Sequence, residues 1–133
     1  MLVLDTHALI WMDADDPSLG KAARRVIRDA WAEGEVGVSA ISFWECAMLL
    51  AAGRIELPGT IAQWRQELLG AGMTEWPVTG EIALLAVSLD LPHKDPADRF
   101  IVATAMARGA ALVTADKLLL DWKNALVRRH AGK

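Results

Sequence analysis

The sequence has one cysteine, no long apolar run and no excess of basic residues. The single thiol, Cys46, cannot form an internal disulfide, which fits a reducing compartment. The longest apolar stretches, such as residues 40–52, are interrupted and shorter than the ~20 residues that a membrane span needs. No basic segment or small-residue cleavage site precedes the first apolar residues. We therefore expect a cytoplasmic protein without a membrane segment.

The chain also has few basic residues: it contains 14 Lys and Arg and 17 Asp and Glu, which gives a net charge of -3. Proteins that bind nucleic acid through phosphate contacts usually carry clustered Lys and Arg. This balance argues against a generally basic nucleic-acid binder. It does not argue against a protein whose acidic side chains gather around metal ions.

No repeat, low-complexity stretch or Pro/Gly-rich linker divides the 133 residues, so we expect one domain over residues 1–133. The hydrophobic fraction of 53% is high and includes six Trp. A chain of this length can bury one continuous apolar core. The excess of apolar residues indicates that some apolar surface is kept for a partner.

Short apolar segments alternate with longer segments of helical period, the pattern of βαβ units around a parallel sheet covered on both faces. The predicted strands are Leu2–Leu4, Val36–Val38, Met73–Trp76, Ala111–Val113 and Ala125–Val127. Besides a first helix after the first strand, the predicted helices are Leu19–Glu33, Ile41–Ala52, Thr60–Leu69, Gly80–Leu89 and Pro96–Arg108. We predict an α/β fold with a short, mainly parallel central sheet.

Four carboxylates stand at the ends of these elements. Asp5 follows the first strand, and Asp116 follows the apolar segment 112–115, so both should project from the carboxyl ends of strands. Glu45 and Asp98 fall in the first turns of two predicted helices. Because parallel α/β sheets present their functional crevice at the carboxyl edge, we expect the four side chains to converge there.

Carboxylates brought together raise one another's pKa and resist joint ionisation unless a cation neutralises them. An oxygen-only ligand set without a Cys/His cluster selects a hard ion, Mg²⁺ or Mn²⁺, rather than zinc. One such ion, or a pair, can generate a nucleophile from water and stabilise charge on a phosphate during in-line displacement. The chemistry indicated is phosphodiester hydrolysis.

Four ordered segments carry a resemblance to a known family: Leu4–Trp11, Ser42–Glu45, Pro92–Arg99 and Leu112–Asp116. Across nearly the whole chain they resemble the motifs of PIN-domain proteins, especially the VapC toxins of VapBC toxin–antitoxin pairs. The resemblance implies a three-layer α/β/α fold and a metal-dependent endoribonuclease that cleaves RNA. It also implies a cognate VapB antitoxin, whose C-terminal segment lies along a groove of the toxin, and a homodimer as the usual building block.

Carried over position by position, the family's acidic quartet falls on Asp5, Glu45, Asp98 and Asp116. The resemblance makes Asp5 and Asp98 the first candidates for direct metal ligands. Glu45 and Asp116 are candidates for ligands, water-mediated ligands or groups that orient the attacking water.

Two hydroxyl and three basic side chains complete the predicted site. Thr6 and Thr114 match positions where a small hydroxyl would hydrogen-bond a carboxylate or a bound water. Arg99, Lys94 and Lys117 flank the acids and are the predicted phosphate contacts. For each basic residue, a surface salt bridge is an equally good interpretation.

The acids also have ordinary structural interpretations. Ser42 and Glu45 have the spacing of a capping box. Asp95 before Pro96 has the pattern of a helix N-cap, with Asp98 favoured by the helix dipole. We assign Asp95 to capping, with a role at the metal site as the minority interpretation.

Histidine and tryptophan are kept outside the predicted site. A lone histidine is more often a packed or capping side chain than a ligand, which applies to His7, His93 and His130. Packing in the core or an interface is favoured over stacking on bases for the tryptophans. Those at helical spacing are Trp11, Trp31, Trp44 and Trp64.

The main alternative function is a non-catalytic interaction module, PIN-like or receiver-like, that uses its acids only to hold a structural ion. A phosphatase of the haloacid dehalogenase type would need a second Asp two residues after Asp5, where the chain has His7. A receiver domain would need an acidic pair near the first strand and a Lys after a late strand, and only Lys117 fits that pattern.

Overall fold

A computed structural model describes all 133 residues, and its five strands form one sheet in which every pairing is parallel. The strands are β1 (Leu2–Leu4), β2 (Val36–Ser39), β3 (Thr74–Trp76), β4 (Ala111–Thr114) and β5 (Arg128–His130). Their order across the sheet is β3-β2-β1-β4-β5, so the first strand is central. The predicted α/β class with a parallel central sheet is confirmed.

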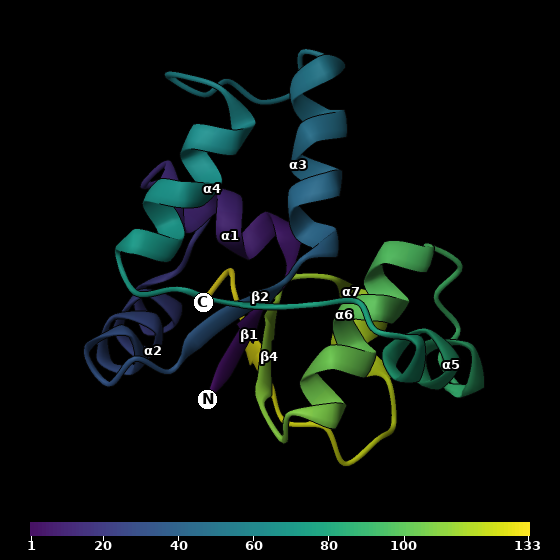
Figure 1. The fold of residues 1–133 in the computed structure, drawn as a ribbon. Helices are drawn as coiled ribbons and strands as arrows, with labels where there is room; N and C mark the ends of the chain where they lie inside the picture. Colours follow the sequence, from purple (N-terminus) through teal and green to yellow (C-terminus); the bar gives the residue numbers. More distant parts are fainter.

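Seven helices surround this sheet. They are α1 (Thr6–Asp13), α2 (Lys21–Ala32), α3 (Ile41–Ala51), α4 (Ile61–Gly70), α5 (Gly80–Ser88), α6 (Pro96–Ala107) and α7 (Lys117–Asp121). Figure 1 shows α1, α2 and α4 on one side of the sheet and α5 and α6 on the other. None of these helices combines the length and the apolar character that crossing a membrane demands.

The central strands are buried on both faces of the sheet, and alternate residues point to opposite faces. In β1, Leu2 and Leu4 belong to the apolar cluster of helices α1 to α4, whereas Val3 belongs to the cluster of α6. In β4, Val113 joins the first cluster and Leu112 the second. Strands covered on both faces consist of continuous apolar residues, which is the pattern seen in the sequence.

The predicted strands and helices lie within two residues of the observed bounds, with one strand as the exception. The last strand is Arg128–His130 rather than Ala125–Val127, and Val127 is 56% exposed. β5 lies at the edge of the sheet, where backbone pairing with β4 sets its position and apolar side chains do not. The short helix α7 was not predicted, because five residues are too few to show a helical period.

Candidate active site

Four acidic side chains from separate elements meet in one pocket at the carboxyl edge of the sheet. They are Asp5, Glu45, Asp98 and Asp116. The pocket has a volume of about 310 Å³. Its other lining residues are Thr6, His7, Trp11, Asp95 and Ala115. β1 and β4 are parallel neighbours, so the segments that follow them carry Asp5 and Asp116 to the same edge.

Asp5 is held in place by the start of α1. Its Oδ1 accepts a hydrogen bond from the backbone N–H of Ala8 at 2.8 Å, which caps the helix. The side chain is only 5% exposed, and burial raises the pKa of Asp5 above its usual value. Hydrogen bonds from the Thr114 hydroxyl and from Ala8 oppose that rise. The carboxyl group is therefore both fixed and largely removed from water.

The helix α3 begins at Ile41, as predicted, and Glu45 is its fifth residue, so it lies at the start of the second turn rather than in the first. The capping-box interpretation is wrong, since α3 has no side-chain cap and Ser42 is buried against the Thr6 hydroxyl at 3.1 Å. The Thr6 hydroxyl also donates a hydrogen bond to Glu45. Burial raises the pKa of Glu45, and the hydrogen bond from Thr6 opposes the rise.

Asp95 and Asp98 stand together at the start of α6. Asp95 is the N-cap, as predicted, and its Oδ1 accepts a hydrogen bond from the Ala97 N–H at 3.0 Å. Asp98 lies in the first turn. Burial, and then the neighbouring carboxyl group of Asp95, raise the pKa of Asp98 to about 7. Asp95 therefore caps the helix and also adds negative charge to the pocket.

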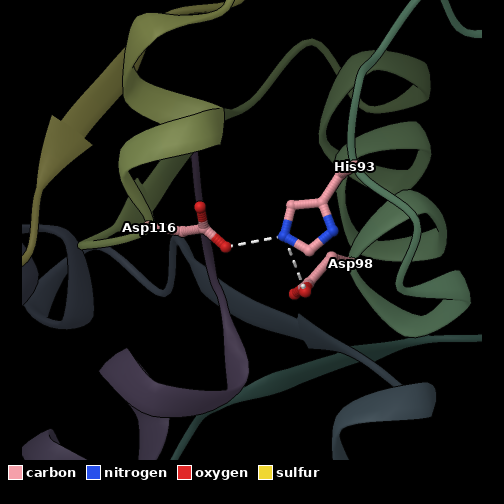
Figure 2. A group of neighbouring side chains, drawn as sticks. All are labelled: His93, Asp98 and Asp116. Atoms are coloured by element: carbon pink, nitrogen blue, oxygen red, sulfur yellow. Dashed lines mark hydrogen bonds and ion pairs between the residues drawn. The ribbon is translucent and has the colours of Figure 1, made fainter.

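Asp116 shares its two oxygens between a helix cap and a histidine. Oδ1 accepts a hydrogen bond from the Leu118 N–H at 2.9 Å, which caps α7. Oδ2 lies 2.7 Å from Nε2 of His93, and the same nitrogen is 3.2 Å from Oδ2 of Asp98. Figure 2 shows the imidazole ring of His93 between the two carboxyl groups. Potential ligand atoms of these three residues all lie within 4.8 Å of one another.

His93 is not among the predicted site residues, but its imidazole ring contacts two of the four acids, Asp98 and Asp116. The signal was present, because His93 belongs to the same segment as Asp95 and Asp98. The general preference for packed histidines outweighed that proximity in sequence.

A PIN-domain profile matches residues 2–122. The chain belongs to the PIN-domain family. It is 38% identical over 119 residues to Ribonuclease VapC22 of Mycobacterium tuberculosis, covering 89% of this chain and 88% of that protein. The family resemblance found in the four sequence segments is therefore confirmed.

Solved structures of related fold cover almost the whole of this PIN domain. A VapBC2 complex from Rickettsia felis, bound to a promoter DNA fragment, contains a chain with a TM-score of 0.69 at 13% identity, covering 96% of both chains. A toxin–antitoxin complex from Klebsiella pneumoniae gives a TM-score of 0.64 at 19% identity, also covering 96% of both chains. At these identities the likeness establishes the fold.

His7 and Trp11 line the acidic pocket of the PIN domain from α1. Their ring centroids are 6.2 Å apart and the rings are tilted by 59°. His7 does not cap α1, because Asp5 is the cap, and its exposed ring lies beside that of Trp11 rather than in the core. The pocket therefore combines aromatic surface with negative charge.

The structure corrects the prediction for Arg99. Its guanidinium group donates to five backbone carbonyl groups at 2.7–3.4 Å. These carbonyl groups belong to Ala86, Val87, Leu89, Leu91 and His93. A guanidinium group has five N–H donors in all. Arg99 has no donor left for a phosphate and instead holds the segment that leads to the site.

The donor set of the pocket fits a divalent cation. Five carboxyl groups line a space of about 310 Å³, and burial raises the pKa of three of them, Asp5, Glu45 and Asp98. Such raised values show that ionising the group is unfavourable without a compensating positive charge. Oxygen ligands of this kind suit Mg²⁺ or Mn²⁺. No thiol lines the pocket.

Proposed function

We propose that this PIN domain is a metal-dependent endoribonuclease toxin that cleaves RNA phosphodiester bonds and is neutralised by a VapB-type antitoxin. The observation that carries the proposal is the convergence of four acids from four elements in one pocket. The name of its relative, Ribonuclease VapC22, supports the same activity at 38% identity. We further propose that residues 1–133 act as one cytoplasmic domain, since the strands from both ends of the chain belong to one sheet.

Asp5, Asp98 and Asp116 are the proposed ligands of Mg²⁺ or Mn²⁺, because they follow neighbouring strands or begin a helix at the same sheet edge. A bound ion supplies positive charge that favours formation of a hydroxide nucleophile and stabilises the phosphate during displacement.

Glu45 is proposed to orient the attacking water and accept its proton. One of its oxygens is held by the Thr6 hydroxyl, so the orientation of the carboxyl group is fixed. Its raised pKa makes it a stronger base than an ordinary glutamate. Thr6 thus positions Glu45, and Thr114 does the same for Asp5 by hydrogen bonding.

Cleavage of a structured RNA by the purified protein tests this proposal. Asp98→Asn should reduce the rate by about 100-fold or more, because it removes a charge that the transition state needs. Addition of EDTA to the native protein should have the same effect. The matched control is Asp29→Asn on α2, whose carboxyl group is exposed and lies outside the pocket. Metal binding without cleavage by the native protein would instead identify a non-catalytic module.

Lys94 and Lys117 are the proposed phosphate contacts. Both side chains are exposed, and each directly follows a residue of the His93, Asp98 and Asp116 group in sequence: Lys94 follows His93, and Lys117 follows Asp116. Lys117 also forms an ion pair with Asp121, which an incoming phosphate would have to replace. Replacing each lysine by alanine should raise KM for RNA and leave kcat nearly unchanged.

The proposed antitoxin site is an apolar groove of about 750 Å³ between α1, α2 and α4. Its apolar lining includes Leu19, Ile27, Trp31 and Trp64, and Arg24 and Arg28 of α2 also line it. An amphipathic segment with acidic residues beside its apolar face would suit this surface. Arg28→Glu should weaken binding of the cognate antitoxin, measured by calorimetry, by about 10-fold. Arg25→Glu on the same helix, outside the groove, is the control.

We also propose a homodimer. Large apolar side chains are exposed on two helices outside both pockets, with Trp44 and Met48 on α3 exposed by 55% and 52%, and Leu84 and Val87 on α5 by 76% and 80%. Trp44 is therefore not a core residue, and an interface is the packing that suits it. Leu84→Lys should convert the dimer to a monomer in sedimentation equilibrium, and a native protein that sediments as a monomer would refute the dimer.

A further inference from the structure

Two hydrogen-bonding contacts fix the proton of His93. The backbone N–H of Asp95 donates to Nδ1 of the ring at 3.2 Å, so Nδ1 must be an acceptor and carries no hydrogen. In a neutral imidazole the hydrogen then sits on Nε2. This tautomer is assigned from the hydrogen-bond partners of the ring. His93 therefore presents an N–H, and no lone pair, to the carboxyl groups of Asp98 and Asp116.

The ring lies between the two acids but is not part of the pocket lining. Asp98 and Asp116 both line the pocket of about 310 Å³, whereas His93 does not. The imidazole side chain is only 12% exposed. A carboxylate oxygen has more than one lone-pair direction, so an oxygen that accepts from His93 can still bind a cation on its pocket side.

The position of the ring is in turn fixed by Arg99. The carbonyl oxygen of His93 accepts a hydrogen bond from Nη1 of Arg99 at 3.1 Å, and that of Leu91 from the same nitrogen at 2.7 Å. The segment before α6 is thereby tied to α6 itself. Because Asp95 is the N-cap of this helix, the contact from its N–H to Nδ1 also orients the imidazole plane.

From these contacts we infer that His93 is a positioning residue, which donates its Nε2–H to Asp116 and Asp98 and so aims their oxygens at the cation, without binding the cation itself. The inference rests on the proposed function, because it presupposes a cation in the acidic pocket. His93, Asp98 and Asp116 lie close together but have different roles in this inference. The two carboxylates contact the cation, and the imidazole ring of His93 orients the carboxylates. Such outer partners affect metal affinity by about 10–100-fold.

Two variants of the protein separate the effect of the hydrogen-bond donor from that of the rest of the His93 side chain. His93→Gln places an amide N–H near the position of Nε2 and keeps the donor. His93→Asn can still accept from the Asp95 N–H but is too short to reach the carboxylates. With Mn²⁺ alone in calorimetry, we expect the Asn variant to bind about 10–100-fold more weakly than the native protein and the Gln variant to bind within about 3-fold of it.

Spectroscopy of the native protein labelled with ¹⁵N-histidine supplies a readout that loss of structure would not imitate. Without metal, the nitrogen spectrum should show His93 as the Nε2–H tautomer. With Mn²⁺ bound, pulsed electron paramagnetic resonance should show no coupling to a directly coordinated imidazole nitrogen.

Three results would overturn the inference and leave the proposed function intact: a coordinated nitrogen that is lost in His93→Gln, an Nδ1–H tautomer, or an Asn variant that binds Mn²⁺ as tightly as the native protein. Failure of the native protein to bind Mn²⁺ would overturn the proposed function and this inference together.

Discussion

Asp98 is a carboxyl group whose ionisation is unfavourable in the folded protein without metal. Burial and the adjacent Asp95 raise its pKa to about 7, from an ordinary value near 4 in an unfolded chain. The folded state therefore binds the proton more tightly than the unfolded state. The stability gained from the protonated form is full below about pH 4 and is lost as pH rises through about 7.

The loss of folding stability with rising pH can be tested with a variant of Asp98. Asp98→Asn resembles the protonated form at every pH, so in EDTA its Tm should exceed that of the native protein by about 5 °C or more at pH 8, and by roughly a third of that difference at pH 5. Thermal unfolding followed by circular dichroism at both pH values measures the effect. The control Asp29→Asn, on an exposed side chain, should give a difference that does not change with pH. A constant difference for Asp98→Asn would contradict the argument.

At the scale of elements, one arginine joins α5, α6 and the segment between them. All five N–H groups of Arg99 donate to backbone carbonyl groups of residues 86–93. Charge-assisted hydrogen bonds of this kind are stronger than neutral ones, and their loss would leave several carbonyl groups without a partner. The segment carries His93 and leads directly to the N-cap of α6.

Arg99→Met should therefore lower stability by about 3 kcal/mol or more, which is a fall in Tm of roughly 10 °C. Arg99→Lys should lose most of the same stability, because three ammonium donors on one nitrogen cannot span five carbonyl groups. Arg25→Met, on an exposed part of α2, is the control and should unfold like the native protein. An Arg99→Met variant with native Tm and weaker RNA binding would favour the phosphate contact predicted from sequence.

The elements that present the acids could be predicted from sequence because each carries a strong local signal. The buried strands are apolar throughout, and the Asp95-Pro96 pair marks the start of α6. The start of α3 at Ile41 agrees with the prediction, but the spacing of Ser42 and Glu45 wrongly indicates a capping box there. In the structure the hydroxyl oxygen of Ser39 accepts the hydrogen bond from the N–H of Ile41.

The surroundings of the acids could not be predicted in the same way. Contacts of His93 and Arg99 depend on the path of residues 89–95, a segment without helical or strand period. Conformations of this kind are set by tertiary contacts rather than by local propensity. The sequence therefore predicted the four acids, and missed the residues that hold two of them.

For the whole molecule, the acidic pocket and the apolar groove share one helix. α1 contributes Thr6, His7 and Trp11 to the pocket, and Met12 and Asp13 to the groove. With eight residues, α1 is about 12 Å long. In the proposed function, an antitoxin segment of ordinary helical length bound along the groove would extend to the pocket and would compete there with RNA for the same surface.

In the proposed function, charge determines when RNA can approach that surface. The chain has a net charge of -3, and its pocket gathers five carboxyl groups that repel phosphate in the absence of a cation. We therefore expect Glu45→Gln, which retains an oxygen ligand but loses the proposed base, to bind a fluorescent RNA at least about 10-fold more weakly in EDTA than with Mn²⁺, at low salt. Fluorescence anisotropy at matched ionic strength measures the difference, because matching removes the screening effect of Mn²⁺ itself. Equal affinity with and without Mn²⁺ would show that basic residues such as Lys94 and Lys117 bind the RNA unaided, and that the metal serves cleavage alone.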